Sequence, residues 1–129
     1  MEVRKATEAD YAEIARILEI LFPNAEFASG ERHAYFVAEE SGKMLGFCHL
    51  VEAKSALVLA GIGVLPGERE KGAGNALIDA AIKYSDGRAS GRLVLKVRAL
   101  NPAIRLYLKK GFTLKKAGEV HVLERKKPN

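Results

Sequence analysis

Apolar residues follow two patterns along this chain, one typical of helices and one typical of strands. The first helix is predicted after residues 7–10, a Thr-x-x-Asp sequence similar to a capping box, and it closes at Pro23. A second helix follows a Gly-rich loop and ends at residues 86–87, and a third starts at Pro102 after the capping residue Asn101. The apolar residues at helical spacing are Ile14, Ile17, Leu18 and Leu21 in the first helix and Leu77, Ile78, Ala81 and Ile82 in the second.

Shorter apolar runs bounded by Gly, Pro or Asp predict strands. Two of these runs are joined by Ser41-Gly42, a pair typical of a hairpin turn. A third run follows directly, and Pro66-Gly67 ends it. The predicted strands are residues 3–6, 34–40, 44–53, 55–65, 93–97, 113–116 and 120–124.

The order of these elements predicts one α/β domain over residues 1–129. Three consecutive strands without a helix between them indicate antiparallel pairing in the first half of the sheet. The passage from strand through loop and helix to the next strand, after residue 65, indicates a parallel crossover. We therefore expect a mixed central sheet of about six or seven strands flanked by about three to four helices.

Length and composition place the chain among ordinary globular proteins. Its 129 residues are 48% hydrophobic and 29% charged, which excludes disordered and low-complexity classes. The longest nearly apolar run, residues 56–65, is half of what a bilayer-spanning helix needs, so no membrane segment is expected. The only cysteine, Cys48, cannot form an internal disulfide, and the cytoplasm is the expected compartment. Because His33, His49 and His121 are far apart in the sequence, no metal site is expected either.

The charge balance modestly favours anionic partners. The net charge is +5 at neutral pH, from 21 Lys and Arg against 16 Asp and Glu. The excess gathers late in the chain, where a solvated surface is the simplest interpretation. No zinc-finger spacing or RNA-reading aromatic motif accompanies it, so nucleic-acid binding is not expected.

The strongest candidate for a binding site is the loop before the second helix. Residues 64–75 read Val-Leu-Pro-Gly-Glu-Arg-Glu-Lys-Gly-Ala-Gly-Asn and lead into a helix N-terminus, where unpaired N–H groups favour an anion. The nucleotide-triphosphatase loop is excluded, because it requires Lys-Ser or Lys-Thr where Ala73-Gly74 stand. The dinucleotide fingerprint is excluded as well, because Leu77 occupies its third glycine position.

The remaining phosphate-loop pattern is Arg69-x-x-Gly72-x-Gly74, directly after a strand. With it, the chain resembles the GNAT family of acetyl-CoA-dependent N-acetyltransferases. Residues 64–78 match the acetyl-CoA loop of that family, and residues 101–112 are similar to its run of asparagine, tyrosine and Gly-Phe. Together with residues 95–98, the second match most resembles the branch that acetylates protein N-termini, including ribosomal-protein enzymes. Lys96 stands where that branch often has an acidic residue.

The resemblance implies an enzyme that moves an acetyl group directly from the CoA thioester to a primary amine. The strand before the loop would splay open to receive the pantetheine arm, and its backbone amides would polarise the carbonyl. Tyr107 is expected as the general acid that protonates the leaving sulfur. The residues expected to bind acetyl-CoA are Ile62, Gly63, Val64, Arg69, Glu70, Lys71, Gly72, Ala73, Gly74, Asn75 and Asn101.

The sequence leaves the general base open. Members of the family often place a carboxylate on the fourth strand, but residues 55–65 contain no Asp or Glu. Glu52 and His49, on the preceding strand, are substitute candidates, and each also has an ordinary place on a half-exposed strand. Cys48 has no motif-linked histidine, so burial explains it better than nucleophilic catalysis does.

Other interpretations also stand at this point. The glycine loop is also compatible with a plain turn, and Tyr107 with a core aromatic, since Ile104, Tyr107 and Leu108 form an ordinary apolar stripe. A non-catalytic acyl-CoA sensor of the same fold would need the loop but not the Tyr107 hydroxyl. The acceptor can be a peptide N-terminus, a lysine or a small amine, and small proteins of this fold often form homodimers through their last strands.

Overall fold

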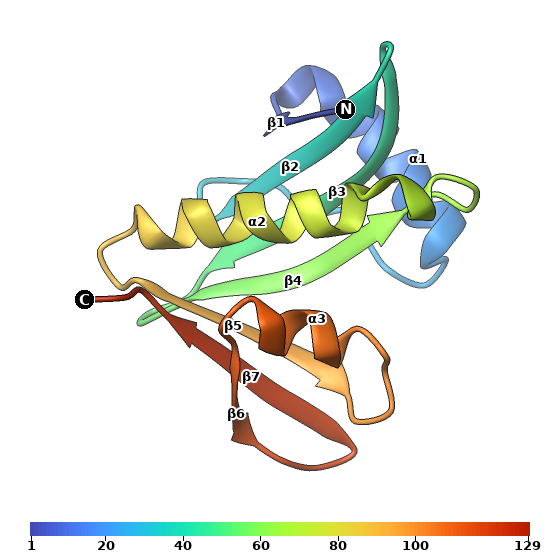
Figure 1. Cartoon of the computed structure of the whole chain (residues 1–129). Coiled ribbons are helices and arrows are strands. Elements are labelled where there is room, and N and C mark those ends of the chain that lie inside the picture. The colour runs from blue at the N-terminus through green and yellow to red at the C-terminus, as the bar shows by residue number, and fades with distance from the viewer.

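A seven-stranded sheet with the strand order β1-β2-β3-β4-β5-β7-β6 forms the centre of the protein (Figure 1). The computed structural model describes the backbone of residues 1–129 and every side chain except that of Glu70. Neighbouring strands pair antiparallel except β4 and β5, which are parallel. The strands are β1 (Glu2–Lys5), β2 (His33–Glu40), β3 (Lys43–Glu52), β4 (Leu57–Val64), β5 (Arg92–Arg98), β6 (Thr113–Lys116) and β7 (Val120–Lys126).

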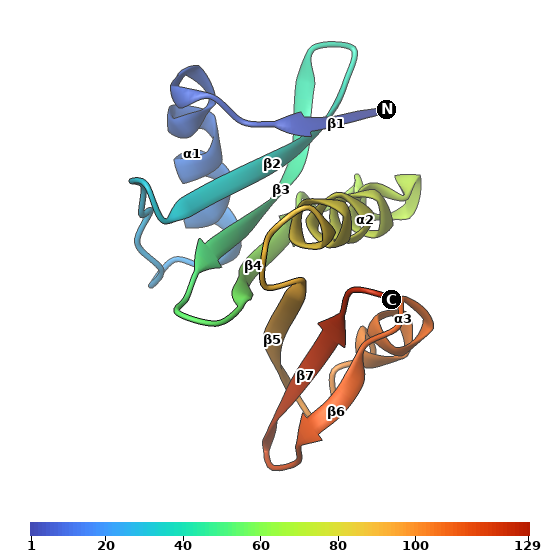
Figure 2. The ribbon, with the colours of Figure 1, turned by 90° about the vertical axis from the view of Figure 1, so that its left-hand side faces the viewer.

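Three α-helices cover the sheet, one on one face and two on the other (Figure 2). Helix α1 (Tyr11–Leu21) lies on the first face, and α2 (Ala73–Asp86) and α3 (Ile104–Lys109) lie on the second. Short 3-10 turns precede α1 and α2, at Glu8–Asp10 and Arg69–Lys71. The predicted single α/β domain, with its antiparallel first half and its parallel crossover through α2, is confirmed.

Local signals explain why α1 begins and ends where it does. The Asp10 carboxylate accepts the Thr7 N–H at 2.8 Å, so the predicted capping box forms. Ile14 and Ile17 are fully buried against the sheet. The helix ends at Leu21, two residues before Pro23.

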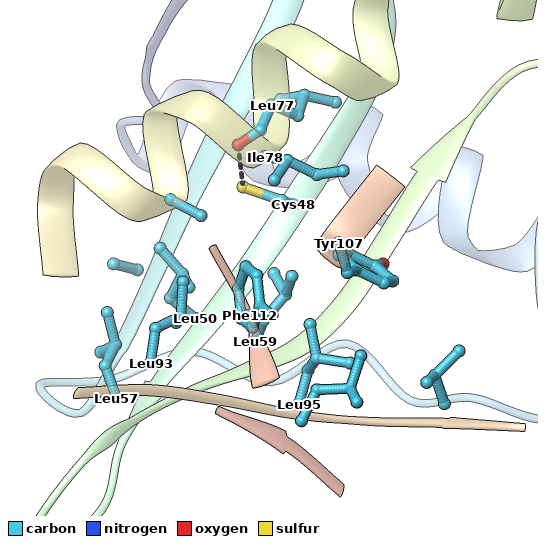
Figure 3. Close-up of a cluster of buried hydrophobic side chains, with 14 of the residues drawn as sticks. Cys48, Leu50, Leu57, Leu59, Leu77, Ile78, Leu93, Leu95, Tyr107 and Phe112 are labelled. Atoms are coloured by element: carbon cyan, nitrogen blue, oxygen red, sulfur yellow. Dashed lines mark hydrogen bonds between the residues drawn. The ribbon is translucent and has the colours of Figure 1, made fainter. Parts of the chain in front are cut away.

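The larger core lies between the sheet and helices α2 and α3 (Figure 3). Leucines of β3, β4 and β5 meet Leu77 and Ile78 of α2 and Phe112, which follows α3. Cys48 is fully buried in this cluster and contacts the Leu77 carbonyl oxygen at 3.8 Å, so it packs as a small apolar residue. Burial raises the pKa of its thiol to about 12, which fits its exclusion from the chemistry.

The start of helix α3 differs from the sequence prediction. Helix α3 begins at Ile104, two residues later than predicted, although Asn101 does cap this turn: its Oδ1 accepts the Ala103 N–H at 2.8 Å. Among the described residues, no helix has the length and apolar character of a bilayer-spanning segment. Within the same part of the chain, no group of three or more His, Cys, Asp or Glu side chains could hold a metal ion.

Candidate functional site

The sheet opens between β4 and β5. These parallel strands pair only at Leu57–Leu93 and Val58–Val94, and β5 continues beyond this point with β7 as its partner. Strand β4 also changes register with β3 at His49/Leu50, where Ala60 is the extra residue of a β-bulge. The later half of β4 therefore presents backbone N–H and C=O groups that β5 does not use.

A cavity of about 330 Å³ lies at this opening, and we call it the splay cavity. It is bounded by the open half of β4, the N-terminal turn of α2, helix α3 and the end of α1. It is lined by Leu21, Phe22, Ile62, Gly63, Val64, Arg69, Gly74, Ile78, Ala103, Leu106 and Tyr107. The structure thus brings together six of the predicted site residues: Ile62, Gly63, Val64, Arg69, Gly74 and Tyr107.

The glycine loop leaves the start of α2 open to a ligand. Gly72 has a φ of +83°, a conformation that side chains rarely adopt, and the space where its Cβ would stand is empty within 4 Å. Among the described residues, no side chain forms a capping hydrogen bond with this helix, and the first intrahelical bond runs from Ala76 N–H to the Gly72 carbonyl at 3.0 Å. A Cβ on Gly74 would meet only Val64, at 3.9 Å. The amides of the first turn are therefore accessible, as an anion site at a helix N-terminus requires.

The charged residues of the loop are largely engaged within the protein. Arg69 donates from Nε to the Val64 carbonyl at 3.1 Å, which ties the loop to the end of β4. Lys71 forms ion pairs with Glu68 at 2.9 Å and Glu40 at 3.2 Å, and these hydrogen bonds raise its pKa. Lys71 lies outside the lining of the splay cavity. The side chain of Glu70, another predicted binding residue, lies outside the described part of the chain.

The other predicted binding residues take different positions. Ala73 is fully buried, and Gly72 and Asn75 lie beside the cavity lining rather than in it. Asn101 is exposed and its Oδ1 is used by the Ala103 N–H, so the structure assigns it a capping contact. A contact between Asn101 and acetyl-CoA stays a prediction.

Tyr107 reaches the splay cavity from α3 (Figure 3). Its side chain is 6% exposed and its ring packs edge-on against Phe112, with the ring centroids 5.6 Å apart. Burial, with a smaller electrostatic effect of Cys48, raises the pKa of its phenol. Within the described part of the chain, its hydroxyl makes no hydrogen bond to protein. The tyrosine is thus both a core aromatic, as the simpler interpretation holds, and a protonated donor at the cavity.

A second cavity, of about 320 Å³, lies on the α1 face next to the bulge, and we call it the His49 cavity. Its lining is mainly apolar, with one carboxylate and one imidazole. It is lined by Leu18, Phe22, Ala25, Glu26, Tyr35, Phe47, His49, Ala60 and Gly61. Phe22 lines both cavities. Consecutive residues of β4 line them as well, residues 60–61 in the His49 cavity and residues 62–64 in the splay cavity, so the two cavities adjoin at the end of α1.

The two substitute bases named from the sequence separate onto different faces of the sheet. His49 lines the cavity beside β4, whereas Glu52 forms an ion pair with Arg88, away from both cavities. His49 has a partner that was not predicted from the sequence: its Nε2 lies 2.8 Å from Nδ1 of His33. The hairpin turn at residues 41–42 does not by itself predict this contact. A register shift at Ala38/Glu39 places His49 opposite Tyr35 and His33 opposite Val51, so the two histidines are diagonal neighbours on one face.

A cavity larger than the splay cavity and the His49 cavity lies elsewhere. It measures about 510 Å³ and lies between β1 and the C-terminal half of α2. None of the predicted site residues lines it. Cavity size alone would therefore have pointed away from the opening of the sheet.

A curated protein with a similar sequence is an N-acetyltransferase. The chain is 38% identical over 96 residues to the ribosomal protein bS18-alanine N-acetyltransferase of Escherichia coli, a match that covers 70% of this chain and 65% of that protein. The match thus spans slightly less than two thirds of the length of this curated relative.

Solved structures show the same fold at lower identity. The ribosomal-protein-S18-alanine N-acetyltransferase of Escherichia coli superposes with a TM-score of 0.82 at 23% identity, over 97% of this chain and 92% of that one. An N-acetyltransferase from Thermoplasma acidophilum in complex with coenzyme A gives a TM-score of 0.75 at 19% identity, over 97% and 98% of the two chains. The sequence model of the acetyltransferase (GNAT) family matches residues 3–112. This chain therefore belongs to the GNAT acetyltransferase family.

Proposed function

We propose that the protein is an acetyl-CoA-dependent N-acetyltransferase that transfers the acetyl group directly to a primary amine. The observation that carries this proposal is the opening between β4 and β5, which places free strand backbone, an uncapped helix N-terminus and a tyrosine hydroxyl around one cavity. Membership of the GNAT family supports the same reaction. The relative named a ribosomal protein bS18-alanine N-acetyltransferase supports an N-terminal amine as acceptor.

The residues around the splay cavity fit acetyl-CoA. The pyrophosphate would lie on the amides at the start of α2, where neither Gly72 nor Gly74 has a side chain to obstruct it. The pantetheine arm would continue the sheet by pairing with Ile62–Val64, whose β5 side is free. Arg69, fixed to the Val64 carbonyl, joins these two regions. When bound, acetyl-CoA supplies the activated acetyl group as a thioester.

Tyr107 would act at the sulfur end of the reaction. Its phenol is protonated at neutral pH because the ordinary pKa of tyrosine is about 10, and burial raises the pKa of this phenol further, so it holds a proton to give to the departing thiolate. Packing against Phe112 fixes the direction of the ring. The backbone N–H groups of the open strand would stabilise the negative charge that develops on the carbonyl oxygen.

The His49 cavity is the proposed site of the acceptor amine. It meets the splay cavity at Phe22, so an amine inside it would approach the acetyl group across the open strand. Its single carboxylate, Glu26, can attract one ammonium group, which favours a monoamine over a polyamine. Peptide α-amines have a pKa of about 7.7–8.0 against about 10.4 for lysine, so far more of an α-amine is neutral and nucleophilic at pH 7.

The proposed function is tested with coenzyme A and an acceptor panel. Calorimetry measures the affinity for coenzyme A, and thiol release from acetyl-CoA is followed with a peptide that begins with alanine, a lysine peptide blocked at its N-terminus, and a polyamine. We expect binding of coenzyme A and thiol release that depends on the alanine peptide. Binding without release for any amine would instead identify an acyl-CoA sensor, and no binding would refute the site itself.

We also propose a homodimer that forms through the last strands. Strand β6 is an edge of the sheet, and Leu114 and Val120 beside this edge are exposed. Light scattering after size exclusion tests this proposal: a particle of twice the chain mass supports it, and one of the chain mass contradicts it. The cytoplasmic location stays a prediction of the sequence.

A further inference from the structure

His33 and His49 form a hydrogen-bonded pair on the α1 face of the sheet. His33 Nδ1 and His49 Nε2 are 2.8 Å apart, and the two rings lie nearly parallel with their centroids 5.1 Å apart. Tyr35 stacks on His49 with a centroid separation of 4.3 Å. The ring of His49 is therefore held in place between neighbours, with its Nδ1 outside the pair.

The pair lies next to the open half of β4. His49 pairs in register with Gly61, and a Cβ on Gly61 would stand 4.0 Å from Cβ of His49, so the missing side chain leaves room beside the imidazole. Ile62–Val64, the stretch proposed to hold the pantetheine arm, follows directly along the strand. Two strand residues span about 7 Å, so an amine beside His49 lies within reach of an acetyl group at Gly63.

The surroundings keep His49 neutral. Burial, together with the repulsion that a positive His33 would exert, lowers the pKa of His49 to about 4. Tyr35, on β2, is also neutral, because burial raises its pKa, and its hydroxyl donates to the Ala28 carbonyl at 2.6 Å. The loop after α1 contributes Glu26 to this cavity, while its described lining residues from α1 and β4 include no titratable group.

We propose that His49 accepts the proton which the acceptor amine releases during acetyl transfer, and that His33 positions His49 and passes the charge on to solvent. The proposal rests on the proposed function, and it supplies the base that the sequence of β4 lacks. His33 is the first residue of β2 and follows an exposed stretch, residues 29–32, so it can exchange protons with water. Glu52 cannot take this role, because its carboxylate is paired with Arg88 on the other face.

The proton transfer balances through the two rings. The neutral amine nitrogen forms a bond to the acetyl carbon, the carbon–sulfur bond breaks, and the thiolate takes a proton from Tyr107. The extra proton on nitrogen moves to Nδ1 of His49, while the Nε2 proton of His49 moves to Nδ1 of His33, which releases its own Nε2 proton to water. After the product leaves, exchange with water returns the Tyr107 proton and the starting tautomers. Because the pKa of His49 is low, this route serves a neutral amine and does not deprotonate an ammonium ion.

The main test is the pH dependence of acetylation by His49→Gln. We expect kcat to fall by about 10²-fold, while the affinity for acetyl-CoA stays within about twofold of the wild type. The wild-type kcat/KM should level off once the amine is neutral, whereas that of the variant should continue to rise with pH, because hydroxide must then remove the proton. Glu52→Gln is the matched control and should retain the wild-type profile. Circular dichroism and acetyl-CoA affinity verify that each variant is folded.

Two further measurements test the pair itself. His33→Phe keeps a ring against His49 but removes its nitrogen, and we expect kcat to fall by about tenfold without a change in acetyl-CoA affinity. Nitrogen-15 NMR of the wild type should show His49 protonated at Nε2, free at Nδ1 and neutral at pH 6. A protonated Nδ1, or titration of His49 near pH 6.5, would refute the relay without any reference to activity.

The possible failures are distinguishable. A wild type that acetylates the alanine peptide, with His49→Gln unchanged in kcat and in pH profile, overturns the role of His49 and leaves the proposed function intact. A wild type that acetylates no amine overturns the proposed function and this inference together. Should His49→Gln fail to fold, His33→Phe and the NMR tautomer decide the question.

Discussion

The substitution Gly74→Ala should make the empty protein more stable and its complex with coenzyme A weaker. Gly74 is the second residue of α2, and a Cβ there would meet only Val64 Cγ2, at 3.9 Å, an ordinary van der Waals contact. Alanine in a helix is more stable than glycine by about 0.5–1 kcal/mol, and a position in the first turn takes the lower end of this range. For a chain of 129 residues, about 0.5 kcal/mol corresponds to a rise in Tm of about 2 °C.

The same methyl group acts against the ligand. Gly74 and Val64 both line the splay cavity, so the new Cβ would stand in the space proposed for the phosphates beside the helix amides. Forcing a methyl group into a filled site costs about 1–3 kcal/mol. At about 1.4 kcal/mol for each tenfold change, the Kd for coenzyme A should rise about 5-fold to 150-fold.

The assay is thermal unfolding with and without coenzyme A, combined with calorimetry for the Kd. Gly87→Ala is the matched control, because Gly87 caps the other end of α2 and lies outside the splay cavity. We expect its affinity for coenzyme A to equal that of the wild type. An unchanged Kd in Gly74→Ala would refute the assignment of the phosphate site. A lowered Tm of the empty variant would refute the claim that this space is open.

Three further predictions concern the reaction and the fold. Tyr107→Phe keeps the packing against Phe112 and should lower kcat by about 10²-fold at saturating acetyl-CoA with little change in affinity; an unchanged kcat would exclude the general-acid role. The hydrogen bonds from Arg4 lower the pKa of Asp10 to about 2, below its unfolded value, so their stabilisation is present above about pH 4 and is lost as the pH falls toward 2. The free energy of unfolding measured in urea should therefore fall more steeply between about pH 4 and pH 2 in the wild type than in Asp10→Asn. Parallel pH curves for the two proteins would contradict the prediction. Gly46→Ala would place its Cβ 2.4 Å from the Gly63 carbonyl oxygen, so we expect the free energy of unfolding in urea to fall by about 1–3 kcal/mol. A decrease below about 0.5 kcal/mol would show that β3 and β4 can separate easily.

Much of the fold could be predicted because the decisive signals are local. The capping box at residues 7–10, the hairpin turn at Ser41-Gly42 and the glycine loop before α2 each depend on a few consecutive residues. Because hairpins and crossovers allow few alternatives, the order of elements then determined most of the sheet. The start of α3 was wrong by two residues, since residues 102–103 form a turn that Asn101 caps before the helix begins.

The site was harder to predict, because its parts meet only in three dimensions. Periodicity gives no sign that β4 and β5 pair over just two residues each, and the opening was expected only from the family resemblance. The resemblance also predicted that Lys71 and Asn101 bind acetyl-CoA. In the structure, the Lys71 side chain forms ion pairs and the Asn101 side chain caps a turn within the protein. Nothing near Phe22 in the sequence shows that it lines both cavities, because this position follows from the packing of α1 across β4.

The most direct test of the whole account is transfer of a labelled acetyl group. The protein is incubated with acetyl-CoA carrying carbon-13 in the acetyl group and with a peptide that begins with alanine, and tandem mass spectrometry locates the label. The account predicts label on the peptide α-amine, at a rate that falls in Tyr107→Phe and in His49→Gln. Bound coenzyme A with no label on any amine, or equal labelling by all three proteins, would contradict it.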